Sequence, residues 1–303
     1  MAANDAQLLR LATYASVATA TVLVLAKLVA WFATGSVSVM ASLVDSLMDV
    51  GASLVNLLAV RYSLQPADDE HRFGHGKAEA LAGLAQATFI VGSAIFLLLH
   101  AIERLLNPVP LANVAGGLWL MAFAIIATLA LLLLQRHVIR RTGSTAIRAD
   151  ALHYATDLAT NAATVAALVL AVYGLPGLDP LFGIAIALYI LYSAGKIGLQ
   201  SVELLMDREL PEPEREVIRR SALDTAGVLG VHGLRTWRSG QRKVIQMHLE
   251  LDPDIGLQEA HLISVRVEEA LLAVDPEADI TIHQDPADPS LADEHNVGDR
   301  FRH

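Results

Sequence analysis

Six apolar runs, each long enough to cross a lipid bilayer as a helix, constrain this chain more than any other feature. They cover residues 8–32, 37–62, 80–102, 111–134, 145–173 and 178–199. A helix needs about 20 mostly apolar residues to span the hydrocarbon core of a membrane. With 54% hydrophobic and only 18% charged residues, the chain also departs from the composition of soluble domains. We therefore expect residues 1–206 to form an all-α bundle of six transmembrane helices.

Charge and cysteine content exclude several classes of function. The formal net charge of −10 argues against nucleic acid as a partner, because binding it needs a basic surface. The chain has no cysteine, which excludes thiolate metal sites and cysteine nucleophiles. The first residues lack a basic segment and a small-residue cleavage site, so we expect the first apolar run to be a retained span.

The charges between the apolar runs predict the orientation. Basic residues gather in the second-to-third and fourth-to-fifth connections, whereas the outward connections offer little beyond Arg104. Basic loops stay in the cytoplasm, so the positive-inside rule predicts a multi-pass protein with both termini cytoplasmic. The basic residues are Arg61, Arg72, Lys77, Arg136, Arg140, Arg141 and Arg148.

Two of the apolar runs carry ionisable pairs at the same spacing. Asp45 and Asp49 lie in the second run, and His153 and Asp157 lie in the fifth. A spacing of four places both members of a pair on one helix face, about 6 Å apart. Because an ionised carboxylate in hydrocarbon costs at least several kcal/mol, an intramembrane acid is by default a candidate functional residue.

The two pairs also lie at matching depth. At 1.5 Å per residue, each is about 12 to 18 Å from the membrane edge where its run enters, in a core about 30 Å thick. Together they offer three carboxylates and one imidazole, a four-ligand set suited to a tetrahedral divalent metal such as zinc. The alternative is that each pair only makes polar contacts between helices. The matched depth favours a metal site.

The loop 63–79, between the second and third runs, contains a second group of ligand types. Its segment DDEHRFGHGK at 68–77 places Asp68, His71 and His75 within eight residues, and its glycines allow a tight turn. Charged loops commonly contain a histidine or two. The residue pattern therefore leaves a metal site and a solvated loop as equal alternatives.

The character of the chain changes after residue 206, where charge rises and the apolar runs shorten. Residues 207–290 predict helices at 211–226 and 257–274 and strands at 231–239, 243–251 and 278–284. This αββαβ order is typical of a small α+β sandwich, ferredoxin- or metallochaperone-like, with its helices on one side of the sheet. We place a cytoplasmic domain here and expect residues 291–303 to be a flexible tail.

Histidines recur in this second domain. A lone histidine is more often a surface residue than a ligand, but four histidines and a nearby acid favour a metal site. Periodicity does not say which of them converge. The residues are His232, His248, His261, His283 and Asp285.

Taken together, these features resemble the cation diffusion facilitator family. The resemblance is carried by the two intramembrane pairs, the loop segment at 68–77, and the segments LVDSL at 43–47 and IHQDP at 282–286. It covers about residues 8 to 285, and the ligand pattern of the family is matched throughout.

The resemblance implies three sets of metal ligands. It implies a transport site in the membrane, a cytoplasmic loop site, and a binuclear cytoplasmic site at the interface of a homodimer, with Gln284 contributing through its backbone or amide. The three sets are, in that order, Asp45, Asp49, His153 and Asp157; Asp68, His71 and His75; and His232, His248, His261, His283 and Asp285.

The resemblance also implies an activity. Such proteins exchange a divalent cation for protons, so we expect an efflux transporter of the bacterial inner membrane, in contact with lipid, and not an enzyme. Its substrate is expected to be Zn²⁺, with Cd²⁺ or Fe²⁺ as further substrates and H⁺ as the coupling ion. Zn²⁺ in the cytoplasmic domain is expected to stabilise the dimer and to regulate transport.

Competing functions predict different observations. A membrane metalloenzyme would need a general base, and the chain contains neither a His-Glu-x-x-His segment nor a Gly-x-Ser-x-Gly elbow. A metal sensor or scaffold would bind metal without flux. A channel is disfavoured because tight four-ligand coordination slows release of the ion.

Overall fold

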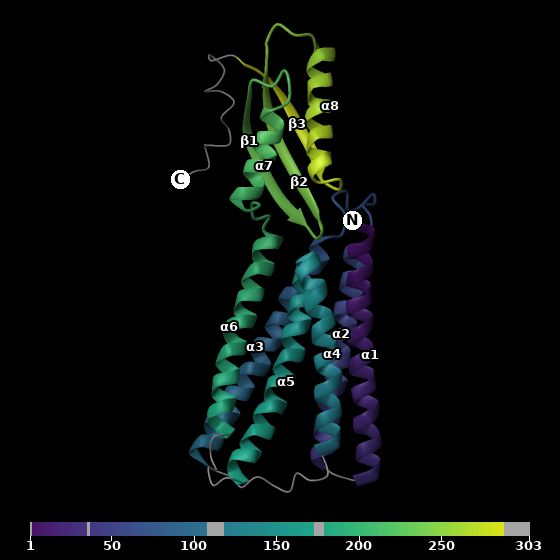
Figure 1. The fold of residues 1–303 in the computed structure, drawn as a ribbon, viewed down its shortest axis with the longest axis vertical. Coiled ribbons are helices and arrows are strands. Elements are labelled where there is room, and N and C mark those ends of the chain that lie inside the picture. The colour runs from purple at the N-terminus through teal and green to yellow at the C-terminus, as the bar shows by residue number, and fades with distance from the viewer. Residues whose placement is uncertain (1, 35–36, 108–117, 173–178, 288–303) are drawn as a thin grey trace. The chain divides into compact units, whose positions relative to one another are not determined.

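A computed structural model describes residues 2–34, 37–107, 118–172 and 179–287 of the chain (Figure 1). The chain folds into two compact units, divided in the sequence between Val202 and Glu203. This division falls close to the boundary predicted after residue 206. The predicted tail, 291–303, lies outside the described residues.

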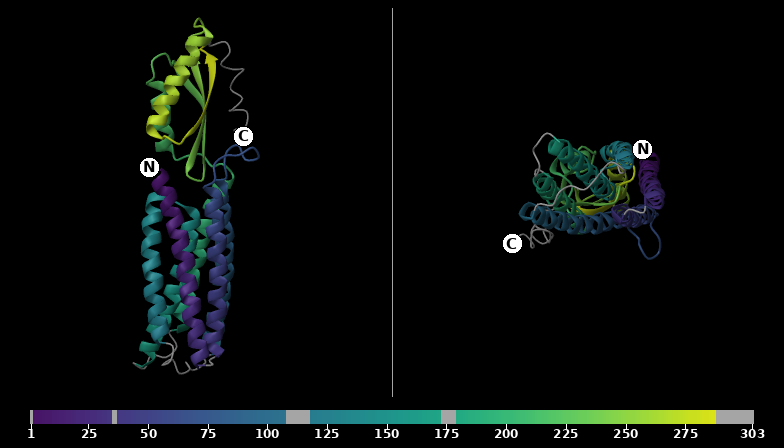
Figure 2. Two further views of the ribbon diagram at one scale, coloured as in Figure 1. Left: turned by 90° about the vertical axis from the view of Figure 1, so that its right-hand side faces the viewer. Right: turned by 90° about the horizontal axis from the view of Figure 1, so that it is seen from below.

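The described residues of the first unit form six long helices. Their axes run roughly alongside one another, as the two side views and the end view show (Figures 1 and 2). The helices are α1 (Ala2–Thr34), α2 (Val37–Ser63), α3 (Lys77–Leu106), α4 (Leu118–Thr142), α5 (Thr145–Val172) and α6 (Asp179–Leu205).

Four of these helices are long and apolar enough to cross a membrane within the described residues. The stretches are Asn4–Ala33, Lys77–Glu103, Ala122–Thr142 and Pro180–Leu205, in α1, α3, α4 and α6. The expectation that all six runs would be this apolar is therefore corrected, because only four of the described helices meet the criterion. The other two helices, α2 and α5, carry the acids and the histidine predicted as metal ligands, and each of these side chains lowers the hydropathy of its helix.

Small and branched side chains pack the six helices together. One buried cluster has members from each of the first five helices, α1 to α5. They include Leu9, Ala12, Val60, Ala82, Val138 and Ile147. A second cluster joins α3 to α6. A Cβ added at Gly83 of α3 would lie 2.9 Å from the Ser201 hydroxyl of α6, so this glycine permits close approach. Such packing of small residues is what holds helices together where lipid removes the hydrophobic driving force.

The second unit has the predicted αββαβ order. Its elements are α7 (Glu212–Leu223), β1 (Gly230–Ser239), β2 (Arg242–Leu251), α8 (Leu257–Val274) and β3 (Asp279–Pro286). The sheet order is β1-β2-β3, with β1 antiparallel and β3 parallel to the central strand β2. Every predicted element is therefore confirmed, with its ends shifted by a few residues at most.

One face of this sheet forms the core and the other stays open. Ile245, Met247 and Leu249 alternate along β2 and are buried against α7 and α8, which cover the same side of the sheet. Figure 2 shows both helices on one side of the three strands. Since successive strand side chains point to opposite faces, His248 must point to the uncovered face.

Candidate metal sites

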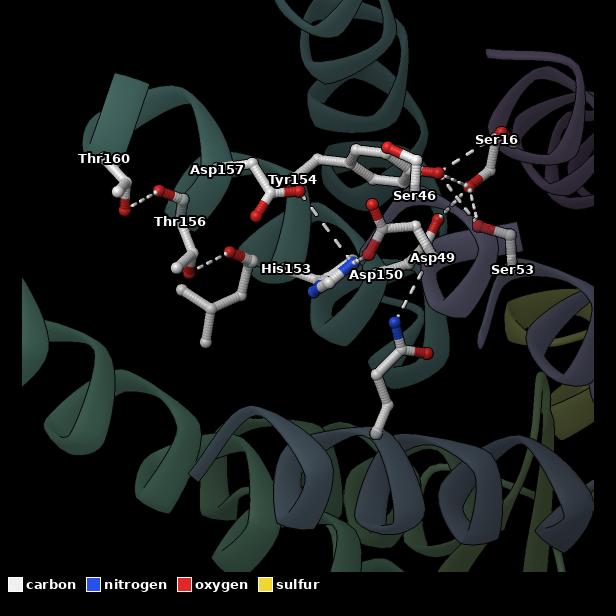
Figure 3. A network of polar contacts seen from close by, with 12 residues as sticks. Ser16, Ser46, Asp49, Ser53, Asp150, His153, Tyr154, Thr156, Asp157 and Thr160 are labelled. Atoms are coloured by element: carbon white, nitrogen blue, oxygen red, sulfur yellow. Dashed lines mark hydrogen bonds and ion pairs between the residues drawn. The ribbon is translucent and has the colours of Figure 1, made fainter. Parts of the chain in front are cut away.

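The first candidate site lies where α2 and α5 meet in the first unit. Asp49 of α2 and His153 and Asp157 of α5 form a group whose possible ligand atoms all lie within 4.8 Å of one another. His153 Nε2 is 2.9 Å from Asp49 Oδ1 and 4.0 Å from Asp157 Oδ2. Figure 3 shows the three side chains converging on one point. The structure thus brings together one member of the first predicted pair and both members of the second.

Local helix geometry explains how each side chain arrives there. His153 and Asp157 are four residues apart on α5, so one helix turn separates them and both face α2. His153 is only 8% exposed and packs its ring against Phe89 of α3 and Tyr154. The fourth predicted ligand, Asp45, belongs to α2, but its side chain lies outside the described residues.

Lysine also reaches this region of α2. Lys27 of α1 donates to the backbone carbonyl of Ser42, 3.1 Å away, and to the hydroxyl of the buried Ser46, 2.6 Å away. These two residues lie on either side of Asp45 in the sequence. Lys27 therefore pairs within the bundle instead of extending to the membrane surface.

The predicted loop group converges between α2 and α3. Oδ1 of Asp68 accepts hydrogen bonds from the backbone N–H groups of Glu70 and His71, at 3.0 and 2.6 Å. Its side chain also faces both histidines, with His71 Nδ1 at 3.4 Å and His75 Nε2 at 3.3 Å. The pKa of Asp68 is lowered, mainly by the hydrogen bond from the backbone N–H of His71. Burial raises this pKa, whereas the backbone N–H of Glu70 and the two imidazoles lower it further.

The orientation of His75 suits metal binding. Its side chain is only 2% exposed, and its Nδ1 lies 3.2 Å from the carbonyl oxygen of Pro66. A carbonyl can only accept a hydrogen bond, so Nδ1 must carry the proton. Nε2, which lies 3.3 Å from Asp68 Oδ2, is then the ring nitrogen that a metal could take in place of a proton. An imidazole held in this way by a backbone carbonyl is the usual arrangement of a metal-binding histidine.

The third group crosses the open face of the sheet in the second unit. The strand register places His232, His248 and His283 side by side on β1, β2 and β3. Asp285, two residues beyond His283, shares their face and lies within reach of all three rings. His248 Nδ1 and His232 Nε2 are 2.8 and 3.2 Å from its Oδ2, and His283 Nε2 is 3.1 Å from its Oδ1.

Asp285 is the centre of this third group. It is 7% exposed, and its ligand atoms with those of His232 and His248 lie within 4.8 Å of one another. Burial raises the pKa of Asp285, but the hydrogen bond from His248 and the charges of the three imidazoles outweigh it and leave the pKa below its usual value.

Two residues predicted for this group lie on the other side of the sheet. His261 is an exposed residue of α8, and its neighbours Ala260 and Ile263 pack onto the covered face. Within one chain the sheet separates it from His232 and His248. Gln284 alternates with His283, so its amide also points to the helices and donates to Ser264 Oγ at 2.8 Å. In this arrangement the Gln284 amide is therefore engaged with α8, and a contribution of Gln284 to the site through its backbone stays a prediction.

Sequence analysis did not single out Asp150, a buried acid on α5 one helix turn before His153. It accepts hydrogen bonds from Ser16, Gln86 and Gln135. Because Asp150 follows the basic segment that ends in Arg148, it resembles a residue of the membrane interface. The signal that could have found it is the spacing of seven to Asp157, which places the two acids on one helix face.

Comparison with protein families decides the identity of both units. Residues 13–206 match the cation efflux transmembrane domain. Residues 210–287 match the cytoplasmic domain of cation efflux proteins, a family of dimerisation domains. The chain belongs to the cation efflux family. This family is the cation diffusion facilitator family that the sequence resembles.

Curated members of the cation efflux family cover almost the whole chain. The cation-efflux pump FieF of Serratia proteamaculans is 51% identical over 281 residues, which is 93% of this chain and 94% of that protein. FieF of Escherichia coli K12 is 50% identical over 275 residues, 91% of this chain and 92% of that protein. The chain is thus a FieF-like cation efflux transporter and not an enzyme.

Two solved structures are similar to about a quarter of the chain. A structure of CzrB, a candidate zinc transporter, is 34% identical and covers 26% of this chain and 99% of that chain, with a TM-score of 0.25. The metal-bound C-terminal domain of the CzcD transporter from Thermotoga maritima is 25% identical, with a TM-score of 0.24. It covers 25% of this chain and 94% of that chain.

Proposed function

We propose that this transporter moves Zn²⁺, and also Cd²⁺ or Fe²⁺, out of the cell across the bacterial inner membrane in exchange for protons. The observation that carries the proposal is the convergence of Asp49, His153 and Asp157 from two helices. Carboxylates and imidazole are ligands that zinc accepts, and four of them give its preferred tetrahedral geometry. Asp45, one turn before Asp49 on α2, would supply the fourth ligand.

The charge of the site supports an exchange of metal for protons. Three carboxylates and a neutral imidazole carry three negative charges, which a divalent cation reduces to one. A ligand must lose its proton before it can bind metal, so protons and the cation compete for the same lone pairs. Protons that enter from outside would therefore displace the cation, and deprotonated ligands open to the cytoplasm would capture the next one.

This cycle needs the site to open to each side of the membrane in turn. We infer that α2 and α5 cross the membrane beside the four apolar helices, because they carry ligands that lie among those helices. Six crossings and the basic connections then place both termini in the cytoplasm. A tilting of the helices that turns the site from one side to the other would complete alternating access.

The other two groups are proposed as cytoplasmic metal sites. In the loop, Asp68, His71 and His75 present ligand atoms within 4.8 Å of one another. In the second unit, His232, His248, His283 and Asp285 would hold metal at the open face of the sheet, with both oxygens of Asp285 available as ligands. The dimerisation-domain match supports a homodimer, and a second copy of the chain would have to supply His261. Metal bound there would stabilise the dimer and regulate transport by favouring one state.

Zinc flux in proteoliposomes tests this function. The full-length chain is reconstituted, Zn²⁺ entry is followed with an internal dye, and the pH gradient is imposed in either direction. We expect the flux to follow the gradient and to be lost in Asp49→Ala. The matched control is Asp69→Asn, which removes an acid that is 93% exposed and pairs with Arg72 in the loop. Wild-type flux that ignores the gradient would contradict proton exchange, and binding without flux would indicate a sensor.

A competition series identifies the substrate. Transport of Zn²⁺ is measured in the presence of Cd²⁺, Fe²⁺ or Mn²⁺ for the intact chain and for Asp49→Ala. We expect Cd²⁺ and Fe²⁺ to compete and to be transported themselves, because the site combines hard carboxylates with a borderline imidazole. A site that carries Zn²⁺ alone would contradict the wider substrate range.

A further inference from the structure

Asp150, on α5 one turn before His153, is a buried carboxylate that is not among the proposed ligands. It is 0% exposed. An ionised carboxylate in such a position must be compensated, because burial of an unpaired charge is costly. Within the described part of the chain no lysine or arginine pairs with it. Its compensation comes from neutral hydrogen-bond donors.

Three donors from three other helices hold this carboxylate. Ser16 Oγ of α1 donates to Oδ2 at 2.7 Å, and Gln135 Nε2 of α4 donates to the same oxygen at 2.7 Å. Gln86 Nε2 of α3 donates to Oδ1 at 3.3 Å. Both carboxylate oxygens therefore accept hydrogen bonds. A carboxylate is acceptor-only when ionised, so donors around both of its oxygens match the anion.

The network continues into α2 through hydroxyl groups. The Tyr154 hydroxyl donates to the backbone carbonyl of Ser16 at 3.3 Å and lies 2.9 Å from Ser53 Oγ. Ser53 Oγ is in turn 3.1 Å from Ser16 Oγ. Figure 3 shows this group of hydroxyls directly beside Asp49 and His153. Every helix from α1 to α5 thus contributes a side chain to a network built around Asp150.

The position of Asp150 on α5 connects this network to the metal ligands. At about 100° per residue, a spacing of seven brings Asp157 back to within about 20° of Asp150 around the helix. His153, three residues after Asp150, lies about 60° from Asp150 around the helix. A rotation of α5 that displaced Asp150 from its donors would therefore turn both proposed ligands away from Asp49.

We propose that Asp150 is a positioning residue of the transport site, a fixed anion that locks α5 at the rotation at which His153 and Asp157 face Asp49. This inference rests on the proposed function of that site. Asp150 touches no cation in this arrangement. It acts through the orientation of the ligands and through its own negative charge.

Zinc uptake by proteoliposomes of the full-length Asp150→Asn variant tests the proposal. Asparagine keeps the shape but removes the charge and places an amide N–H₂ against the donors. We expect the KM for Zn²⁺ to rise roughly 10-fold to 100-fold, as for other residues that orient metal ligands, with a much smaller change in maximal rate. A purely structural residue would instead lower the melting temperature and the maximal rate at an unchanged KM, and that result would overturn the proposal.

Two further variants separate charge from folding. Gln135→Leu keeps the acid and removes one donor, so it should raise the KM in the same direction by a smaller factor. Asp150→Asn combined with Gln135→Glu returns a carboxylate to the same place from α4, and should recover most of the lost affinity. A double variant no better than Asp150→Asn would overturn the role of the charge.

Thr13→Val is the matched control. Thr13 is another buried polar residue of α1, but its hydroxyl bonds only to carbonyls of its own helix. The KM of Thr13→Val for Zn²⁺ should equal that of the wild type. A rise in KM as large as that of Asp150→Asn would show a general effect of buried polar groups and would overturn the proposal. An absence of wild-type flux would reject the proposed function itself, whereas a wild-type KM in both Asp150→Asn and Gln135→Leu would reject only this inference.

Discussion

Replacing Asp285 by asparagine should remove the zinc response of the cytoplasmic unit while leaving its fold intact. Asp285 is nearly buried and lies within 2.8 to 3.2 Å of three imidazoles. Asparagine has the same shape, so the sheet and its packing should be kept. It lacks the charge that attracts the three rings and the second oxygen that can bridge two metal ions.

The structure gives the size of the effect in two parts. Without metal, the variant loses a charge-assisted hydrogen bond from His248, worth about 1.5 to 3 kcal/mol. Because the imidazoles are at least one-third exposed, we expect the lower end of this range. With zinc at about 100 times its dissociation constant, the wild type gains about 2.7 kcal/mol from binding. The variant should gain almost none of it.

Tryptophan fluorescence during denaturation of the full-length protein in detergent measures both parts. The chain has three tryptophans, of which only Trp237 belongs to the second unit, so Trp31→Phe and Trp119→Phe leave a single reporter there. Unfolding is followed with and without zinc for the wild type and for Asp285→Asn in this background.

Glu250→Gln is the control, since it removes an acid 3.8 Å from His232 on the same face that is outside the converging group. It should keep the zinc response. A zinc-induced shift in Asp285→Asn as large as that of the wild type would refute the assignment of Asp285 as a ligand.

Three further predictions follow from groups outside the membrane helices. Burial raises the pKa of Glu214, but its salt bridges with Arg238 and Lys243 outweigh burial and lower the pKa. The stability that Glu214 contributes is therefore fully present above the unfolded pKa of about 4.3 and is lost as the pH falls through the lower folded pKa. Denaturation from pH 7 to pH 3 should therefore show Glu214→Gln less stable than the wild type at neutral pH and equal to it at the acid end; a constant difference would contradict this. Gly233 has φ +58°, and an added Cβ would lie 2.9 Å from the ring of His248. Gly233→Ala should therefore lower the free energy of unfolding by about 1 kcal/mol or more and weaken zinc binding in calorimetry. The control is Gly256→Ala, because a Cβ at Gly256 meets open space. Asp68→Asn should reduce the number of zinc ions retained per chain in equilibrium dialysis, because it removes the carboxylate that faces both His71 and His75. The control is Glu70→Gln at an exposed position of the same loop, which should retain the full number of zinc ions.

Local patterns predicted most of the secondary structure. The alternation of Ile245, Met247 and Leu249 with His248 and Gln246 identified a strand with one buried face, because strand side chains point to the two faces in turn. The spacing of four in each intramembrane pair likewise placed its two members on one helix face. Such periodicities depend only on backbone geometry, so the sequence carries them in full.

Convergence between elements was beyond local patterns. The depth argument allowed the pairs on α2 and α5 to meet, but only the packing of these two helices brings Asp49 within 2.9 Å of His153. The strand register likewise selected His232, His248 and Asp285 as one group and placed His261 behind the sheet. Sequence spacing cannot decide such distances, because they depend on how separate elements are rotated and paired.

The sequence by itself determined the class of protein, the αββαβ unit and the chemical types of the ligands, since hydropathy, alternation and the choice of Asp and His are properties of the residues alone. The tertiary structure decided which ligands share a site and gave Asp150 its place. A single carboxylate in a helix shows no partner in the sequence; Ser16, Gln86 and Gln135 become its donors only when four helices pack around one buried charge.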